Sequence, residues 1–97
     1  MLKVRYSLRA LEEQLELFEY LERSFGNSKA KEVYERLESS LKVLSSMPKM
    51  YPLSKEYVGV RKYVFSKQTS IYYREDGEYL EIISIYSNKR NPRNLNL

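Results

Sequence analysis

The hydrophobic periodicity of this chain changes once, at Pro48, from a helical to a strand-like spacing. Before Pro48, apolar residues recur every three or four positions in two runs: Leu11, Leu15, Phe18, Leu21 and Phe25, then Ala30, Val33, Leu37, Leu41 and Leu44. This spacing predicts two amphipathic helices whose apolar stripes form the core. Gly26-Asn27 leaves only a short connection between them, so the helices are expected to run antiparallel as a hairpin.

Alternation with a period of two predicts the strands. A short strand is expected at Leu2–Tyr6, and Ser7 can cap the helix that follows. After a loop at Met50–Lys55, three strands are expected at 57–65, 68–74 and 78–86, with a hairpin turn at Asp76-Gly77. The last of these is apolar on both faces, which is typical of a central strand. The sequence therefore predicts an α+β fold of order β-α-α-β-β-β, a helical hairpin packed on a small, mainly antiparallel sheet.

The residue types that are missing exclude several classes of protein. The chain has 97 residues, enough for a single domain over 1–97, and it contains no Cys and no His. These absences exclude disulfides, thiolate metal sites and the usual general base near neutral pH, so no metal and no cofactor is expected. No apolar stretch is long enough to cross a membrane and no signal peptide opens the chain, so we expect a cytoplasmic protein without membrane contact.

Positive charge and tyrosine gather in the second half of the chain. Residues 1–48 hold eight Lys/Arg and eight Asp/Glu, whereas residues 49–97 hold nine against five, so the whole net charge of +4 lies there. Seven of the ten tyrosines lie between Tyr51 and Tyr86, and the last ten residues form a basic tail. This distribution indicates an anionic partner, either nucleic acid or an acidic protein segment. Alternatively, tyrosine suits strands and lysine keeps sheet edges soluble.

Several of these motifs, taken in order, resemble the RelE/ParE superfamily of bacterial toxins from type II toxin–antitoxin pairs. The resemblance covers nearly the whole chain. It rests on Arg61, on Ser70-Ile71-Tyr72-Tyr73-Arg74 with the Glu75-Asp76-Gly77 turn, on Ile82-Ile83-Ser84-Ile85, and on a basic segment that reaches Asn91-Pro92 and Leu95. The helix start at Ser7 and the helix end at Met47-Pro48 are also similar to the family. The resemblance implies a cognate antitoxin as partner and a toxic action on an essential target.

Members of this superfamily act in one of two ways. RelE-like members cleave messenger RNA on the ribosome without a metal, using an Arg in an Arg-aliphatic-aliphatic-Tyr strand and a His or Tyr near the C-terminus. Here Ser70 takes the place of that Arg, His is absent, and no Tyr follows Tyr86. ParE-like members inhibit DNA gyrase and need no catalytic residue, so the missing groups favour a non-enzymatic, ParE-like toxin. The alternatives are an endoribonuclease in which Arg61, Arg74, Lys89 and Arg90 stabilise the phosphate, and a binding module that has lost toxicity.

The resemblance also indicates which residues meet a partner. The residues expected to bind target or antitoxin are Arg61, Tyr63, Tyr72, Lys89, Arg90 and Arg93. Lys49 and Lys55 would neutralise phosphate charge if the chain were a nuclease. An acidic, partly disordered antitoxin segment is expected to fold across the helical hairpin and the sheet edge, covering Arg61 and the Lys89/Arg90 turn.

Overall fold

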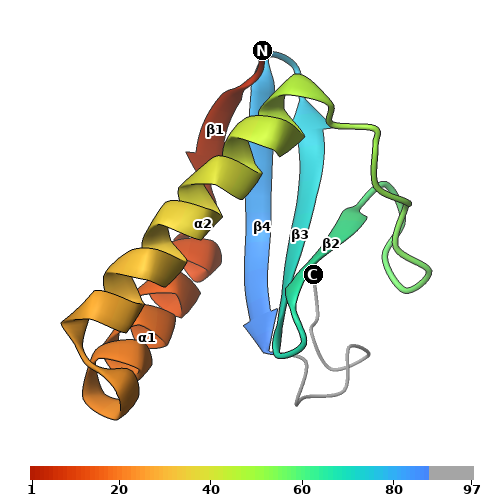
Figure 1. Cartoon of the computed structure of the whole chain (residues 1–97). Helices are drawn as coiled ribbons and strands as arrows, with labels where there is room; N and C mark the ends of the chain where they lie inside the picture. The colour runs from red at the N-terminus through yellow and green to blue at the C-terminus, as the bar shows by residue number, and fades with distance from the viewer. Residues whose placement is uncertain (88–97) are drawn as a thin grey trace.

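The fold is given by a computed structural model that describes residues 1–87. Its elements follow the expected order: β1 (Lys3–Tyr6), α1 (Leu8–Phe25), α2 (Asn27–Ser46), β2 (Arg61–Ser66), β3 (Thr69–Asp76) and β4 (Tyr79–Ser87). The predicted order β-α-α-β-β-β is confirmed (Figure 1). The predicted basic tail, with Lys89, Arg90 and Arg93, lies outside the described residues.

The four strands form one mixed sheet in the order β1-β4-β3-β2. β1 pairs parallel with β4, and the other two pairings are antiparallel, as expected for a mainly antiparallel sheet. β4 lies between β1 and β3, which confirms that the last strand is central. Two-residue turns at 67–68 and 77–78 join the antiparallel strands, one residue later than the sequence indicated, and Gly77 supplies a φ of +60°.

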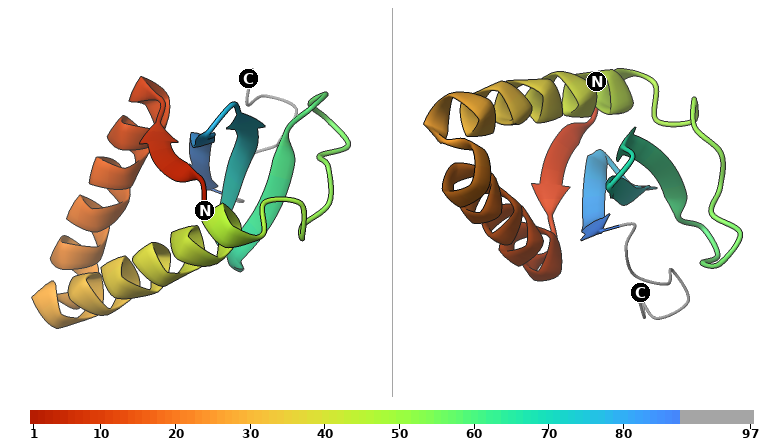
Figure 2. Two further views of the ribbon diagram at one scale, coloured as in Figure 1. Left: turned by 90° about the horizontal axis from the view of Figure 1, so that it is seen from above. Right: turned by 60° about the horizontal axis from the view of Figure 1, so that its bottom comes forward.

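The two helices pack on one face of this sheet, as two views of the ribbon show (Figure 2). Ser7 begins α1: its Oγ accepts a hydrogen bond from the Ala10 N–H at 3.0 Å and donates one to the Ile83 carbonyl at 2.7 Å. Gly26 alone joins the helices, with a φ of +90° that favours glycine. The connection is therefore shorter than the sequence suggested.

Buried apolar residues form two clusters, one on each face of the sheet. The larger cluster joins the helices to Phe65, Ile71, Tyr73 and the core-facing residues of β4. The smaller one lies on the opposite face and contains Val60, Tyr72, Tyr86, Tyr57 and Ile83. Because the segment 54–60 folds as a turn that places Val60 against this second face, the strand expected at 57–65 begins only at Arg61.

The apolar stripe expected in the first helix is only partly buried. In α2 all five expected core residues are buried. In α1, however, Leu11, Leu15 and Phe25 are 45%, 63% and 61% exposed, and the buried residues are Ala10 and Leu21. The helix therefore presents a different face to the core than its leucine pattern predicted. Neither described helix is long and apolar enough to cross a membrane.

Candidate functional site

Arg61 and Tyr63 lie on the helix-facing side of β2, next to the segment that connects α2 to the sheet. Arg61 pairs with Tyr73, a residue of the larger core, and residues directly opposite each other in an antiparallel pair share a face. The Arg61 guanidinium donates a 2.6 Å hydrogen bond from Nη1 to the carbonyl of Tyr51. The ring of Tyr51 packs at 4.7 Å from that of Tyr63, whose hydroxyl is 3.3 Å from the Ser40 hydroxyl.

Tyr73, opposite Arg61 on β3, is the fourth side chain of this group. It is fully buried, and its hydroxyl donates a 3.0 Å hydrogen bond to the carbonyl of Pro48. Burial raises the pKa of Tyr73 to about 12, with Arg61 acting in the opposite direction. Arg61, half-buried with one N–H committed to the Tyr51 carbonyl, keeps further donors for a carboxylate or a phosphate. We call Tyr51, Arg61, Tyr63 and Tyr73 the Arg61 cluster.

A shallow cavity opens beside the Arg61 cluster, between α2 and the edge of the sheet. Its volume is about 190 Å³, and it is lined by Ser39, Ser40, Val43, Leu44, Tyr51 and Tyr63. The lining is aromatic and apolar with two hydroxyls, and Arg61 lies two residues from Tyr63 on the same face of β2. The arrangement suits a small apolar side chain of a partner next to an anionic group.

Tyr72 and Arg74 lie on the opposite face of the sheet. Tyr72 is fully buried, with the rings of Tyr57 and Tyr86 packed edge-on against it, so in this structure it offers no surface on which a base could stack. Arg74 donates a 2.7 Å hydrogen bond from Nε to Glu81, which also accepts one from Arg5 at 3.2 Å. The structure therefore brings Arg61 and Tyr63 together and separates both from Tyr72 and Arg74.

The remaining expected residues do not add a catalytic group. Ser70, at the place of the family arginine, is fully buried in β3 between Val64 and Tyr86. Lys49 and Lys55 are exposed in the connection between α2 and β2, and neither has an ion-pair partner within 4 Å among residues 1–87. The described part of the chain contains no group of three or more carboxylate, His or Cys side chains that could hold a metal ion.

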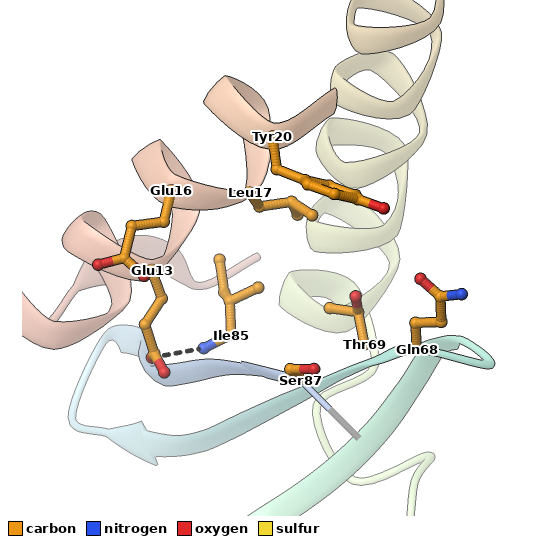
Figure 3. A pocket seen from close by; sticks show the side chains of 8 residues that line it. All are labelled: Glu13, Glu16, Leu17, Tyr20, Gln68, Thr69, Ile85 and Ser87. Carbon is orange, nitrogen blue, oxygen red and sulfur yellow. Dashed lines mark hydrogen bonds between the residues drawn. The ribbon is translucent and has the colours of Figure 1, made fainter. Parts of the chain in front are cut away.

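A second, more polar cavity was not expected from the sequence. It lies between α1 and the sheet, has a volume of about 320 Å³, and is lined by Glu13, Glu16, Leu17, Tyr20, Gln68, Thr69, Ile85 and Ser87 (Figure 3). One carboxylate oxygen of Glu13 accepts hydrogen bonds from the Ser84 hydroxyl at 2.7 Å and from the Ile85 N–H at 3.1 Å. Glu13 looked like one of many helix-surface glutamates in the sequence, and nothing there distinguished it.

Comparison with solved structures finds the same architecture in several proteins. A chain of the chromosomal ParDE toxin–antitoxin system from P. aeruginosa superposes with a TM-score of 0.77 at 18% identity, over 90% of this chain and 96% of that one. A YoeB/ParE toxin from Agrobacterium tumefaciens gives 0.64 at 16%, over 90% and 99%. YafQ from E. coli gives 0.61 at 14%, over 92% and 96%. No curated protein sequence matches the chain.

These likenesses define the class of fold: the α+β fold of the RelE/ParE toxins, with a helical hairpin on one face of a four-stranded sheet. The family model described as the ParE toxin of the type II toxin–antitoxin system, parDE, matches residues 4–92. The chain therefore belongs to the ParE toxin family of type II toxin–antitoxin systems.

Proposed function

We propose that this toxin inhibits bacterial growth by binding DNA gyrase, without cleaving RNA. The observation that carries the proposal is the separation of the two described cations that a nuclease would need. Arg61 lies on the helix-facing side of the sheet and is hydrogen-bonded to the Tyr51 carbonyl, whereas Arg74 lies on the other side and is paired with Glu81. Cleavage needs cations that converge on one phosphate, within about 3 Å of the oxygens that become charged.

Buried Ser70 supports the same conclusion. A serine that is fully buried inside the sheet has no positive charge with which to hold a scissile phosphate. Binding a protein target requires a complementary surface and no catalytic group, and the half-buried Arg61 cluster with its 190 Å³ cavity would form part of that surface.

RNA cleavage on the ribosome is the second candidate. It is kept because the fold resembles YoeB and YafQ as well as the ParDE chain, so the architecture alone does not select the target. In this alternative Arg61 acts with Lys89 and Arg90, which lie outside the described residues.

The proposal includes an antitoxin as the partner that neutralises the toxin in the cytoplasm. Similar structures include a YoeB–YefM complex from Staphylococcus aureus and the ParDE system from P. aeruginosa. A carboxylate of the antitoxin would accept hydrogen bonds from the remaining N–H groups of the Arg61 guanidinium. An apolar side chain beside that carboxylate would fill the neighbouring cavity. Binding there covers the surface that we assign to the target.

The test compares two purified activities in three variants. The wild-type chain, Arg61→Gln and the matched control Arg74→Gln are assayed for inhibition of gyrase supercoiling and for cleavage of ribosome-bound messenger RNA. We expect gyrase inhibition that Arg61→Gln weakens at least tenfold and Arg74→Gln leaves unchanged, with no RNA cleavage. RNA cleavage by the wild type would overturn the proposal, and inactivity in both assays would indicate a binding module that has lost toxicity.

A further inference from the structure

α1 exposes a row of leucines that neither the core nor the Arg61 cluster uses. Leu8, Leu11 and Leu15 are 72%, 45% and 63% exposed. They are spaced by three and four residues, so they follow one another along the same side of the helix. A single exposed leucine is ordinary on a protein surface, but a contiguous row of three forms an apolar patch of the kind found at interaction sites.

The same side of α1 is acidic on balance, with Arg23 as one exposed cation among its glutamates. Four exposed glutamates accompany the leucines: Glu12, Glu16, Glu19 and Glu22. None of the four has an ion-pair partner within 4 Å among residues 1–87, whereas Glu13 on the sheet side is paired with Arg9 at 3.7 Å. Glu12 and Glu16 are four residues apart, and like charges at that spacing destabilise a helix. Helical periodicity places all four within the half of the helix that carries the leucines.

We call Leu8, Leu11 and Leu15 with these four glutamates the acidic leucine face. In the isolated chain, both of its components are unfavourable, since the leucines contact water and the carboxylates repel one another. One kind of partner removes both costs. It has apolar side chains that cover the leucines and Lys or Arg side chains that pair with the glutamates. An acidic segment would cover the leucines but increase the repulsion.

We propose that the acidic leucine face of α1 binds a basic amphipathic segment of the antitoxin. This inference rests on the proposed function, and it adds a second contact to the acidic segment expected at Arg61. The three leucines extend over about 10 Å along the helix, since each residue advances it by about 1.5 Å. This length matches two turns of a partner helix with apolar residues at positions i, i+3 or i+4, and i+7. Glu16 also lines the 320 Å³ cavity, together with Tyr20 (Figure 3). The Tyr20 ring could contact both the alkyl chain and the cationic group of a Lys or Arg side chain that pairs with Glu16.

The antitoxin fits this face better than a second copy of the toxin. Two copies meeting through the same face would bring glutamates against glutamates, because a twofold contact pairs a surface with itself. The basic end of this chain, with Lys89, Arg90 and Arg93, has the positive charge needed to compete with the antitoxin for the acidic leucine face. Variants of these three residues are therefore included in the test.

The test measures binding of the full chain to its antitoxin by calorimetry. The variants are Leu11→Gln/Leu15→Gln, Glu12→Lys/Glu16→Lys, and the matched control Val58→Gln, whose apolar side chain is fully exposed in segment 54–60, on the other face of the sheet. We expect both double variants to weaken binding at least tenfold, or about 1.4 kcal/mol, with the control unchanged. Thermal melting of each variant verifies that it is folded.

The charge reversal gives opposite results for opposite partners. If the bound segment is acidic, Glu12→Lys/Glu16→Lys tightens binding, and the proposal is wrong. Unchanged affinity in both double variants overturns it as well, as does a wild-type toxin that is a dimer in solution and becomes a monomer on Leu11→Gln/Leu15→Gln. Tighter antitoxin binding after Lys89→Gln/Arg90→Gln/Arg93→Gln would assign the face to the chain's own basic end. Failure of wild-type toxin to bind any antitoxin would instead contradict the proposed function.

Discussion

Replacement of Glu13 by alanine tests how α1 is fixed to the sheet. The Glu13 carboxylate reaches from α1 to β4, where one oxygen accepts two hydrogen bonds, from the Ser84 hydroxyl and the Ile85 N–H. Ser84 is fully buried, and the Glu13 side chain is only 16% exposed. Glu13→Ala therefore leaves a buried hydroxyl and an N–H without their acceptor, with water able to reach them only through the neighbouring cavity.

The cost follows from these two lost contacts. Each buried polar group left without a partner costs about 1–3 kcal/mol, and the neighbouring cavity lets water recover part of that loss. We expect Glu13→Ala to lower the free energy of unfolding by about 2–4 kcal/mol. In a domain of this size each 1 kcal/mol corresponds to about 4–8 °C in melting temperature, so the variant should melt at least about 8 °C lower.

Urea denaturation of four variants separates the contributions. Glu13→Gln keeps an acceptor oxygen but loses the charge, and it should cost only about 1 kcal/mol. In the Ser84→Ala background, Glu13→Ala should cost less than it does alone, because one of the two unsatisfied groups is gone. A loss below about 0.5 kcal/mol for Glu13→Ala, or strict additivity with Ser84→Ala, would refute the reasoning.

Three further predictions concern stability. Burial raises the pKa values of Tyr6 and Tyr73 to about 12, so the unfolded chain loses these protons at lower pH than the folded chain does. The free energy of unfolding should therefore fall between pH 10 and 12, and it should fall less in Tyr73→Phe. A flat profile in urea titrations at alkaline pH would contradict this. Val60→Ala should cost about 2 kcal/mol in urea, because Val60 packs against Tyr72 in the second core; no loss would mean that segment 54–60 does not cover that face. Gly77→Ala should cost about 1 kcal/mol by thermal melting because φ is +60°, whereas Gly77→Asn should be milder.

Local patterns were sufficient to predict the elements of this fold. Pro48 ends α2, the stripe of α2 is buried throughout, and the doubly apolar last strand lies inside the sheet. Two errors have the same physical origin. Val58 and Val60 alternate as in a strand, yet Val58 is fully exposed at a turn where Gly59 has a φ of +75°. Leu11 and Leu15 have core spacing but face outward. Periodicity reports that a face is apolar, and it does not say which molecule covers that face.

The candidate site was less predictable than the fold. Arg61 and Tyr63 lie on one face because residues two apart in a strand do so. The backbone carbonyl of Tyr51 and the hydroxyl of Ser40, which hold these two side chains, depend on how the long connection returns to β2. The burial of Tyr72 likewise depends on segment 54–60, which packs on the face that a bare sheet would leave open. Such contacts come from tertiary packing of loops, for which the sequence has no periodic signal.

The most direct test of gyrase as the target is a pulse-labelling experiment in bacteria after tightly induced expression of the full chain without antitoxin. Incorporation of thymidine and of methionine is followed side by side over the first minutes, with Arg61→Gln as the matched variant. Inhibition of gyrase predicts that thymidine incorporation falls first while methionine incorporation continues, and that Arg61→Gln delays the fall. Loss of methionine incorporation before thymidine incorporation would contradict this proposal and identify translation as the target.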